Sequence, residues 1–129
     1  MPRKIILVVD DEEDAQVFIE NILDEDKYKI ISAWDGVTGY KEAVTQKPDL
    51  IILDVQMPVQ DGFTTYRQLK ENAATSDIPI IMLTAIGPKR GIHFSQEEML
   101  AHYGNAPAHY LEKPFDPVKL QLLVTELLG

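Results

Sequence analysis

Two uninterrupted apolar runs, each followed at once by a carboxylate, most constrain how this chain can fold. Residues 5–9 read IILVV before Asp10 and Asp11, and residues 50–53 read LIIL before Asp54. Such runs are too short for independent helices, and unbroken apolarity is typical of strands that are covered on both faces, as in parallel sheets. The carboxyl ends of such strands form the ligand crevice of an open α/β sheet, so we expect these carboxylates at the crevice.

The rest of the chain alternates between strand and helix patterns. Residues 28–33, 78–83 and 109–111 are predicted as further strands, the first of them at an edge of the sheet. Apolar residues at helical spacing predict the helices: Ala15, Phe18, Ile19, Ile22 and Leu23; Val37, Tyr40 and Val44; Phe63, Tyr66 and Leu69 or Lys70; and Leu120, Leu123, Val124 and Leu127 after an Asp116 cap and Pro117. This alternation predicts a flavodoxin-like, doubly wound parallel sheet of five strands in the order 2-1-3-4-5, with helices on both faces.

Length and charge narrow the class of protein. The 129 residues give room for a single domain, 1–129, and the absence of cysteine excludes disulfides and thiolate metal sites. A formal charge of −9 argues against nucleic acid or an anionic membrane as a direct partner and favours a metal cation. No apolar run is long enough to span a bilayer, and these features together predict a cytoplasmic protein.

The least regular segment is residues 85–103. It begins with a locally basic, glycine-containing loop, and Ser95 to Glu98 form a capping box that predicts a short helix. We expect an extended loop and brief helix after the fourth strand, and no effector domain after Gly129.

Polar side chains follow four of the predicted strands and are expected to meet in one crevice. These residues are Asp10, Asp11, Asp54, Thr84 and Lys113. Neighbouring carboxylates repel one another unless a cation is bound, and oxygen-only ligands favour Mg²⁺. A cation, a lysine and a hydroxyl around an aspartate suit phosphoryl transfer, with Asp54 as the nucleophile. Mg²⁺ is then expected on Asp11, Asp54 and a backbone carbonyl near Gln56.

With these residues assembled, the sequence resembles the receiver domain of two-component response regulators, the CheY-like family. The matching blocks are residues 8–12, 35–36, 48–58, 61–62, 79–85 and 110–115. The resemblance implies that Asp54 is the phosphoacceptor, Asp10 and Asp11 the acidic pair for Mg²⁺, and Lys113 the phosphate-binding lysine. It also implies that Thr84 is the switch hydroxyl and Tyr110 the switch aromatic.

The function implied by this resemblance is a signalling switch rather than an enzyme with a separate substrate. The domain would accept a phosphoryl group from a histidine kinase or a histidine phosphotransfer protein, and would assist its own Mg²⁺-dependent phosphorylation and dephosphorylation. Output is expected through contact with a downstream protein. One departure is that the interval from Thr84 to Lys113 is longer than the family norm, with the excess in residues 85–103.

Two other classes of protein fit parts of the pattern. A Mg²⁺-dependent phosphatase of the haloacid-dehalogenase type also uses an aspartate nucleophile, but it requires a second aspartate two residues later, where this chain has Gln56. A phosphate-independent pseudo-receiver or flavodoxin-like binding module would keep the fold alone. A flavin phosphate would be repelled by the acidic residues 10–13 in the absence of a cation.

Overall fold

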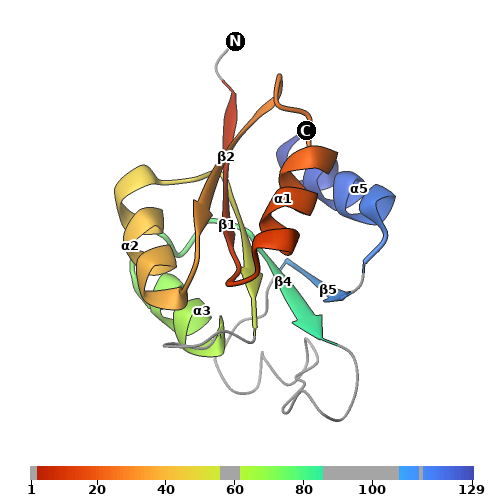
Figure 1. The fold of residues 1–129 in the computed structure, drawn as a ribbon. Helices are drawn as coiled ribbons and strands as arrows, with labels where there is room; N and C mark the ends of the chain where they lie inside the picture. Colours follow the sequence, from red (N-terminus) through yellow and green to blue (C-terminus); the bar gives the residue numbers. More distant parts are fainter. Residues whose placement is uncertain (1–2, 56–61, 86–107, 114) are drawn as a thin grey trace.

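The computed structural model describes residues 3–55, 62–85, 108–113 and 115–129 of this chain (Figure 1). The Gln56 carbonyl and, beyond Ala85, the loop and helix predicted within residues 85–103 lie outside the described residues. Their structure, and the division of the chain into one domain, stay predictions.

Strands and helices alternate along the described chain. The strands are β1 (Lys4–Val9), β2 (Tyr28–Ala33), β3 (Leu50–Asp54), β4 (Ile80–Ala85) and β5 (His109–Lys113), and the helices are α1 (Glu13–Ile22), α2 (Gly36–Gln46), α3 (Gly62–Glu71) and α5 (Pro117–Leu128). All strand pairs are parallel, in the order β2-β1-β3-β4-β5, which confirms the predicted topology and the edge position of β2. The long crossovers required by this order place helices on both faces of the sheet (Figure 1).

Side chains that alternate along the strands divide the core into two layers. One layer joins the sheet to α1 and α5 and contains Ile6, Val8, Leu50, Ile52, Ile81 and Leu83 with Ile19, Leu120 and Val124. The other joins the sheet to α2 and α3 and contains Leu7, Val9, Ile51, Leu53, Ile80 and Met82 with Ala43, Tyr66 and Leu69. β1 and β3 contribute side chains to both layers, so these strands are covered on both faces, which explains why they are almost entirely apolar.

Two helices each expose one residue of the predicted buried stripe, Phe18 in α1 and Val37 in α2. In α1, Ile19 and Leu23 are buried and Ile22 packs against them, as predicted, and Gln16 is buried in addition. Phe18 departs from the prediction, since it is 40% exposed and packs edge-on against Phe115 with ring centroids 5.5 Å apart. In α2 the exposed Val37 was wrongly placed on the buried stripe, which instead contains the small residues Gly36, Gly39 and Ala43. A Cβ on Gly39 would lie 2.8 Å from both Val9 methyl groups, so small residues let α2 approach the sheet closely.

The fourth strand also begins later than predicted. It starts at Ile80 rather than Ile78, because the Ile78 amide donates to the Thr75 carbonyl in the turn after α3. The last helix starts as predicted, with Pro117 in its first turn and the Asp116 carboxylate accepting from the Val118 amide. Among the described residues, no helix is long and apolar enough to cross a membrane.

Candidate functional site

The predicted site residues of the sheet lie where its strands end. Asp10 directly follows β1, Asp54 and Lys113 end β3 and β5, and Thr84 is the penultimate residue of β4. Parallel strands end at the same edge, so their register brings these residues together. Asp10, Asp54 and Thr84 are buried, and the Lys113 side chain is 20% exposed. The apolar strands thus place charged groups at the rim of the core, where a polar ligand has access.

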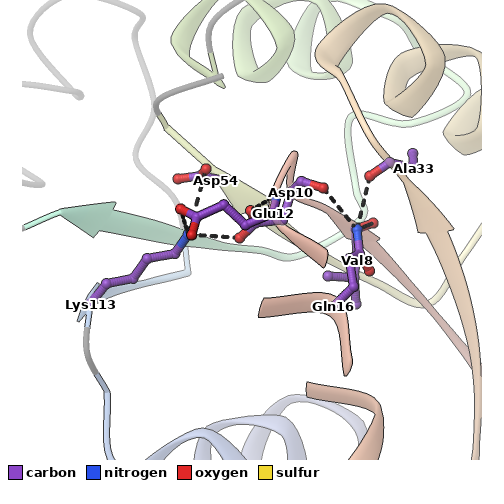
Figure 2. A network of polar contacts seen from close by, with 7 residues as sticks. All are labelled: Val8, Asp10, Glu12, Gln16, Ala33, Asp54 and Lys113. Atoms are coloured by element: carbon purple, nitrogen blue, oxygen red, sulfur yellow. Dashed lines mark hydrogen bonds and ion pairs between the residues drawn. The ribbon is translucent and has the colours of Figure 1, made fainter. Parts of the chain in front are cut away.

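Lys113 is the cation around which the carboxylates gather. Its Nζ donates a hydrogen bond to Asp10 Oδ2 at 2.8 Å and lies 3.6 Å from Asp54 Oδ2 and 3.8 Å from Glu12 Oε1. Figure 2 shows the amino group between Asp54 on one side and Asp10 with Glu12 on the other. This lysine therefore bridges the ends of β1 and β3, and it lies in one crevice with Asp10 and Asp54.

The carboxylates also determine the protonation of Lys113. Burial by itself lowers the pKa of Lys113, because it disfavours the charged amine. The hydrogen bond to Asp10, and then the charges of Asp54, Asp10 and Glu12, outweigh burial and raise the pKa above its ordinary value of 10.5. Lys113 is consequently a permanent cation at neutral pH, as a group that binds a phosphoryl oxygen must be.

Three consecutive acidic residues form a group with metal-binding geometry. One carboxylate oxygen from each of Asp10, Asp11 and Glu12 lies within 4.8 Å of the others. Asp10 is buried and the other two are exposed, so the group opens to solvent. Oxygen ligands at this spacing suit a hard cation such as Mg²⁺. The sequence predicted Asp10 and Asp11 for this role and overlooked Glu12, whose position directly after them was the available signal.

The two predicted switch residues share one face of the sheet. Tyr110 pairs with Met82, two residues before Thr84, and side chains two residues apart on a strand point the same way. Tyr110 packs beside the α2–α3 core layer and is partly buried. The buried Thr84 Oγ1 has no hydrogen-bond partner among the described residues. A buried hydroxyl in that state has an unused capacity to bind an oxygen ligand.

Two residues that were not predicted as site residues support this site, although one of them, Gly62, lies in the matching block 61–62. Gln16, on α1, is 2% exposed and donates from its side chain to backbone carbonyls at the ends of β1 and β2 (Figure 2). Gly62 begins α3 directly against β3, where a Cβ would lie 2.3 Å from the Asp54 carbonyl oxygen and 2.6 Å from Val55 Cα. Any larger residue at position 62 would displace the backbone that carries Asp54.

These groups have complementary chemical capacities. A carboxylate such as that of Asp54 is able to act as a nucleophile, Lys113 is a cation beside it, and the Asp10–Glu12 group is able to hold a divalent cation. The Thr84 hydroxyl, which has no hydrogen-bond partner within the described part of the chain, adds a neutral donor. A phosphoryl group needs this combination, since its transfer depends mainly on positioning and on neutralising negative oxygens.

Comparison with protein families and curated sequences gives a consistent result. The model of the response regulator receiver domain matches residues 6–125. The transcriptional regulator RpaA of a Synechocystis species is 35% identical over 128 residues, which is 99% of this chain and 49% of RpaA. The regulatory protein PhoP of Bacillus subtilis is 35% identical over 98% of this chain and 49% of PhoP. The chain thus spans about half the length of these curated relatives.

Solved structures show the same fold. The receiver domain of a sensor histidine kinase from Pseudomonas aeruginosa, which has a magnesium ion coordinated in its active-site cleft, superposes with a TM-score of 0.81 at 29% identity and covers 99% of both chains. The chemotaxis protein CheY4 of Vibrio cholerae gives a TM-score of 0.79 at 26% identity, over 98% of this chain and 100% of CheY4.

Proposed function

Because this chain belongs to the response regulator receiver domain family, we propose that it is a signalling switch in which Asp54 is the residue that accepts the phosphoryl group. The observation that carries this assignment is the position of Lys113 Nζ, 3.6 Å from Asp54 Oδ2 and 2.8 Å from Asp10 Oδ2. A half-buried lysine held between the ends of two strands is poised to bind the oxygens of a phosphoryl group on Asp54.

The reaction itself is a displacement at phosphorus. An Asp54 carboxylate oxygen forms the new oxygen–phosphorus bond while the bond from phosphorus to the donor nitrogen of a phosphohistidine breaks, and the released imidazole takes a proton from water. The product is an acyl phosphate. Lys113 stabilises the negative oxygens during this step, and its raised pKa keeps it charged throughout.

A magnesium ion is the cofactor that the acidic group fits. Asp10 and Asp11 would hold it, together with Asp54 and the backbone carbonyl of Gln56. When bound, Mg²⁺ supplies neutralisation of charge on the phosphoryl oxygens. Glu12 would add negative charge beside the cation. Lys113 would reduce the repulsion between the buried carboxylates of Asp10 and Asp54, because its amino group lies near both.

The response to phosphorylation would begin at Thr84. Its buried hydroxyl is free to bind a phosphoryl oxygen, and its movement toward Asp54 would vacate space on the face that it shares with Tyr110. Rotation of Tyr110 into that space would change the surface formed by β4 and β5. A downstream protein that recognises this surface would then read the phosphorylation state.

The partners follow from this chemistry and from the charge of the chain. The donor would be a histidine kinase or a histidine phosphotransfer protein, in the cytoplasm, and this chain would act on no separate substrate. Relatives such as RpaA are DNA-binding, but the matched region is only about half of RpaA. With a formal charge of −9, this part is expected to contact protein rather than nucleic acid.

Intact-mass measurement with acetyl phosphate and Mg²⁺ tests the proposal. The native chain should gain one phosphoryl group, and it should not do so when the metal is chelated before the donor is added. Asp54→Ala should abolish the gain, whereas Asp24→Ala should not, because Asp24 is an exposed carboxylate in the turn before β2, where it accepts from the Asp26 amide. Absence of a gain with acetyl phosphate and with phosphohistidine donors would instead indicate a phosphate-independent binding module.

A further inference from the structure

The buried side chain of Gln16 donates hydrogen bonds to three backbone carbonyls beside the site. Its Nε2 lies 3.1 Å from the Val8 carbonyl, 3.1 Å from the Asp10 carbonyl and 2.9 Å from the Ala33 carbonyl (Figure 2). Val8 lies near the end of β1, Asp10 directly follows that strand, and Ala33 is the last residue of β2. A single side chain from α1 therefore joins three backbone segments at the edge that carries the site.

The orientation of the Gln16 amide is fixed by these neighbours. If the amide were flipped, its oxygen would face three carbonyl oxygens, so only the nitrogen can occupy this place. The amide has two hydrogens for three acceptors, and Gln16 Oε1 is buried with no hydrogen-bond partner among the described residues. The Gln16 side chain thus satisfies backbone carbonyls, while its own buried oxygen, Oε1, accepts no hydrogen bond from the described residues.

Asp10 is the residue that these bonds immobilise. Its amide donates to the Ala33 carbonyl at 3.1 Å, and its carbonyl accepts from Gln16. Its side chain accepts from the Glu12 amide at 3.0 Å and from Lys113. Of these contacts, the one to Gln16 fixes the Asp10 carbonyl, and with it the direction in which the chain enters the turn that carries Asp11 and Glu12.

We propose that Gln16 is a positioning residue for the metal group, which holds the backbone of Asp10 so that the carboxylates of Asp10 and Asp11 face a shared cation. This inference rests on the proposed function, because it assumes that the acidic group binds Mg²⁺. Gln16 contacts neither the cation nor the phosphoryl group, and acts through the turn between β1 and α1. It determines the affinity for Mg²⁺, and it leaves the reactivity of Asp54 unchanged once the metal is bound.

Two variants separate this role from a contribution to folding alone. Gln16→Met keeps the length and volume of the side chain and removes its donors, and Gln16→Asn keeps the amide but shortens its reach by one methylene. Calorimetric titration with Mg²⁺ should give a dissociation constant about tenfold higher for Gln16→Met, the lower end of the range found for groups that orient metal ligands. Gln16→Asn should have a smaller effect, about threefold, because it keeps the amide. With saturating Mg²⁺, phosphorylation by acetyl phosphate should return to within about twofold of the native rate.

Gln121→Met is the matched control, since Gln121 on α5 also donates from its side chain to a backbone carbonyl, that of Ile22, at 2.6 Å. It should leave Mg²⁺ affinity unchanged. Hydrogen exchange of the Asp10 amide, measured without metal, should accelerate in Gln16→Met and not in the control. Unchanged Mg²⁺ affinity in a folded Gln16→Met protein, or in Gln16→Asn where Gln16→Met does not fold, would overturn the positioning role. Failure of the native chain to bind Mg²⁺ would overturn it together with the metal site, a separate and distinguishable result.

Discussion

Two half-buried lysines lie at opposite ends of the sheet, and their surroundings differ in kind. Lys113 ends β5 and faces the carboxylates of Asp10, Asp54 and Glu12. Lys70 lies near the end of α3, where its Nζ donates to the backbone carbonyls of Ser76 (3.1 Å) and Ile78 (3.0 Å) just before β4.

The protonation of the two lysines follows from these partners. Burial lowers the pKa of Lys70, and the charge of Asp77 only partly opposes it, whereas the carboxylates raise the pKa of Lys113 despite burial. Carbonyl groups complete the hydrogen bonding of an amine without bringing a net charge. Three carboxylates around one ammonium leave a negative surplus, which gives the carboxyl end of the sheet an electrostatic reason to recruit another cation.

Other polar groups at the amino end of the sheet also form their hydrogen bonds within the protein. The Asp49 carboxylate accepts from the Ile5 amide at 2.8 Å, and the Asp49 amide donates to the Ile5 carbonyl at 2.7 Å. The buried Thr75 hydroxyl donates to the Leu69 carbonyl at 2.6 Å. Thr84, at the other end, has no such partner among the described residues. At the amino end of the sheet these polar groups are satisfied by the protein itself, whereas at the carboxyl end the Thr84 hydroxyl, among the described residues, still has the capacity to bind a ligand.

Among the replacements considered, that of Lys113 should lower the unfolding free energy most. Lys113→Met leaves the fully buried Asp10 without its 2.8 Å partner, and loss of one member of a buried ion pair costs about 3 kcal/mol or more of unfolding free energy. Urea denaturation at neutral pH in a metal-free buffer measures the change. Lys119→Met, at an exposed position on α5, is the control and should change stability by less than about 0.5 kcal/mol. Equal losses in the two variants would show that the carboxylates do not depend on Lys113.

Magnesium should stabilise the folded chain through the carboxyl end alone. At a concentration of about 100 times its dissociation constant, Mg²⁺ should add about 2.7 kcal/mol to the unfolding free energy, because it binds only the folded state. Asp11→Asn should lose most of this increment, since it removes a charge from the proposed metal group. Urea denaturation with Mg²⁺ and with chelator gives both values. An equal increment in Asp11→Asn would place the bound metal elsewhere.

Replacing Lys70 should lower the unfolding free energy by a smaller amount, because it removes hydrogen bonds to carbonyls rather than an ion pair. Lys70→Met removes two hydrogen bonds from a charged donor and leaves the Ser76 and Ile78 carbonyls to water, at a cost of about 1.5 kcal/mol. Its affinity for Mg²⁺ should stay unchanged, which calorimetric titration would show. A large change in that affinity would contradict the separation of the two ends.

Alkaline pH should affect the two lysines in opposite directions. A raised folded-state pKa means that Lys113 contributes stability below 10.5, and that this contribution is lost as pH rises through the higher folded value. A lowered folded-state pKa means that the stability gained from neutral Lys70 is present above 10.5 and is lost as pH falls through the folded value. The stability difference from native should therefore shrink for Lys113→Met and grow for Lys70→Met as pH rises. Parallel slopes in urea denaturation would refute this assignment.

The smallest effect concerns Tyr66, whose ring lies 5.8 Å from Lys70 Nζ. Burial raises the pKa of Tyr66 to about 12, because the charged phenolate is poorly solvated in the core. Ultraviolet absorbance should show one tyrosine that titrates near pH 12 in the folded chain and near its ordinary value of 10.0 in urea. The late step should disappear in Tyr66→Phe, and its persistence there would assign it to another tyrosine.

The sequence predicted the strands and the charged site because both depend on local patterns. An apolar run that ends in an acid marks a strand end, and parallel topology then brings such ends together, as for Asp10, Asp54 and Lys113. The sequence did not reveal Gln16, because one glutamine in an amphipathic helix reads as a solvated residue. Its burial depends on carbonyls of two strands, and one of these, Ala33, lies 17 residues away.

The errors in helix faces have a similar cause. The position of α2 depends on how closely its backbone approaches β1, and the signal for that approach is the absence of a side chain at Gly39. Hydrophobic spacing favours large residues such as Val37 and gives no weight to small ones. The inward glycine and alanine residues were therefore passed over, although they fix the packing of that helix.

The ion pair between Lys113 and Asp10 also has a consequence for synthesis, because its two members are 103 residues apart. At about 5–20 residues per second, a ribosome takes roughly 5–20 seconds to add the lysine after the aspartate. Over the same interval the ribosome adds the segments of β2 and β3, which flank β1 in the finished sheet. For those seconds the acidic turn exists without Lys113, the cation with which Asp10 pairs in the folded chain.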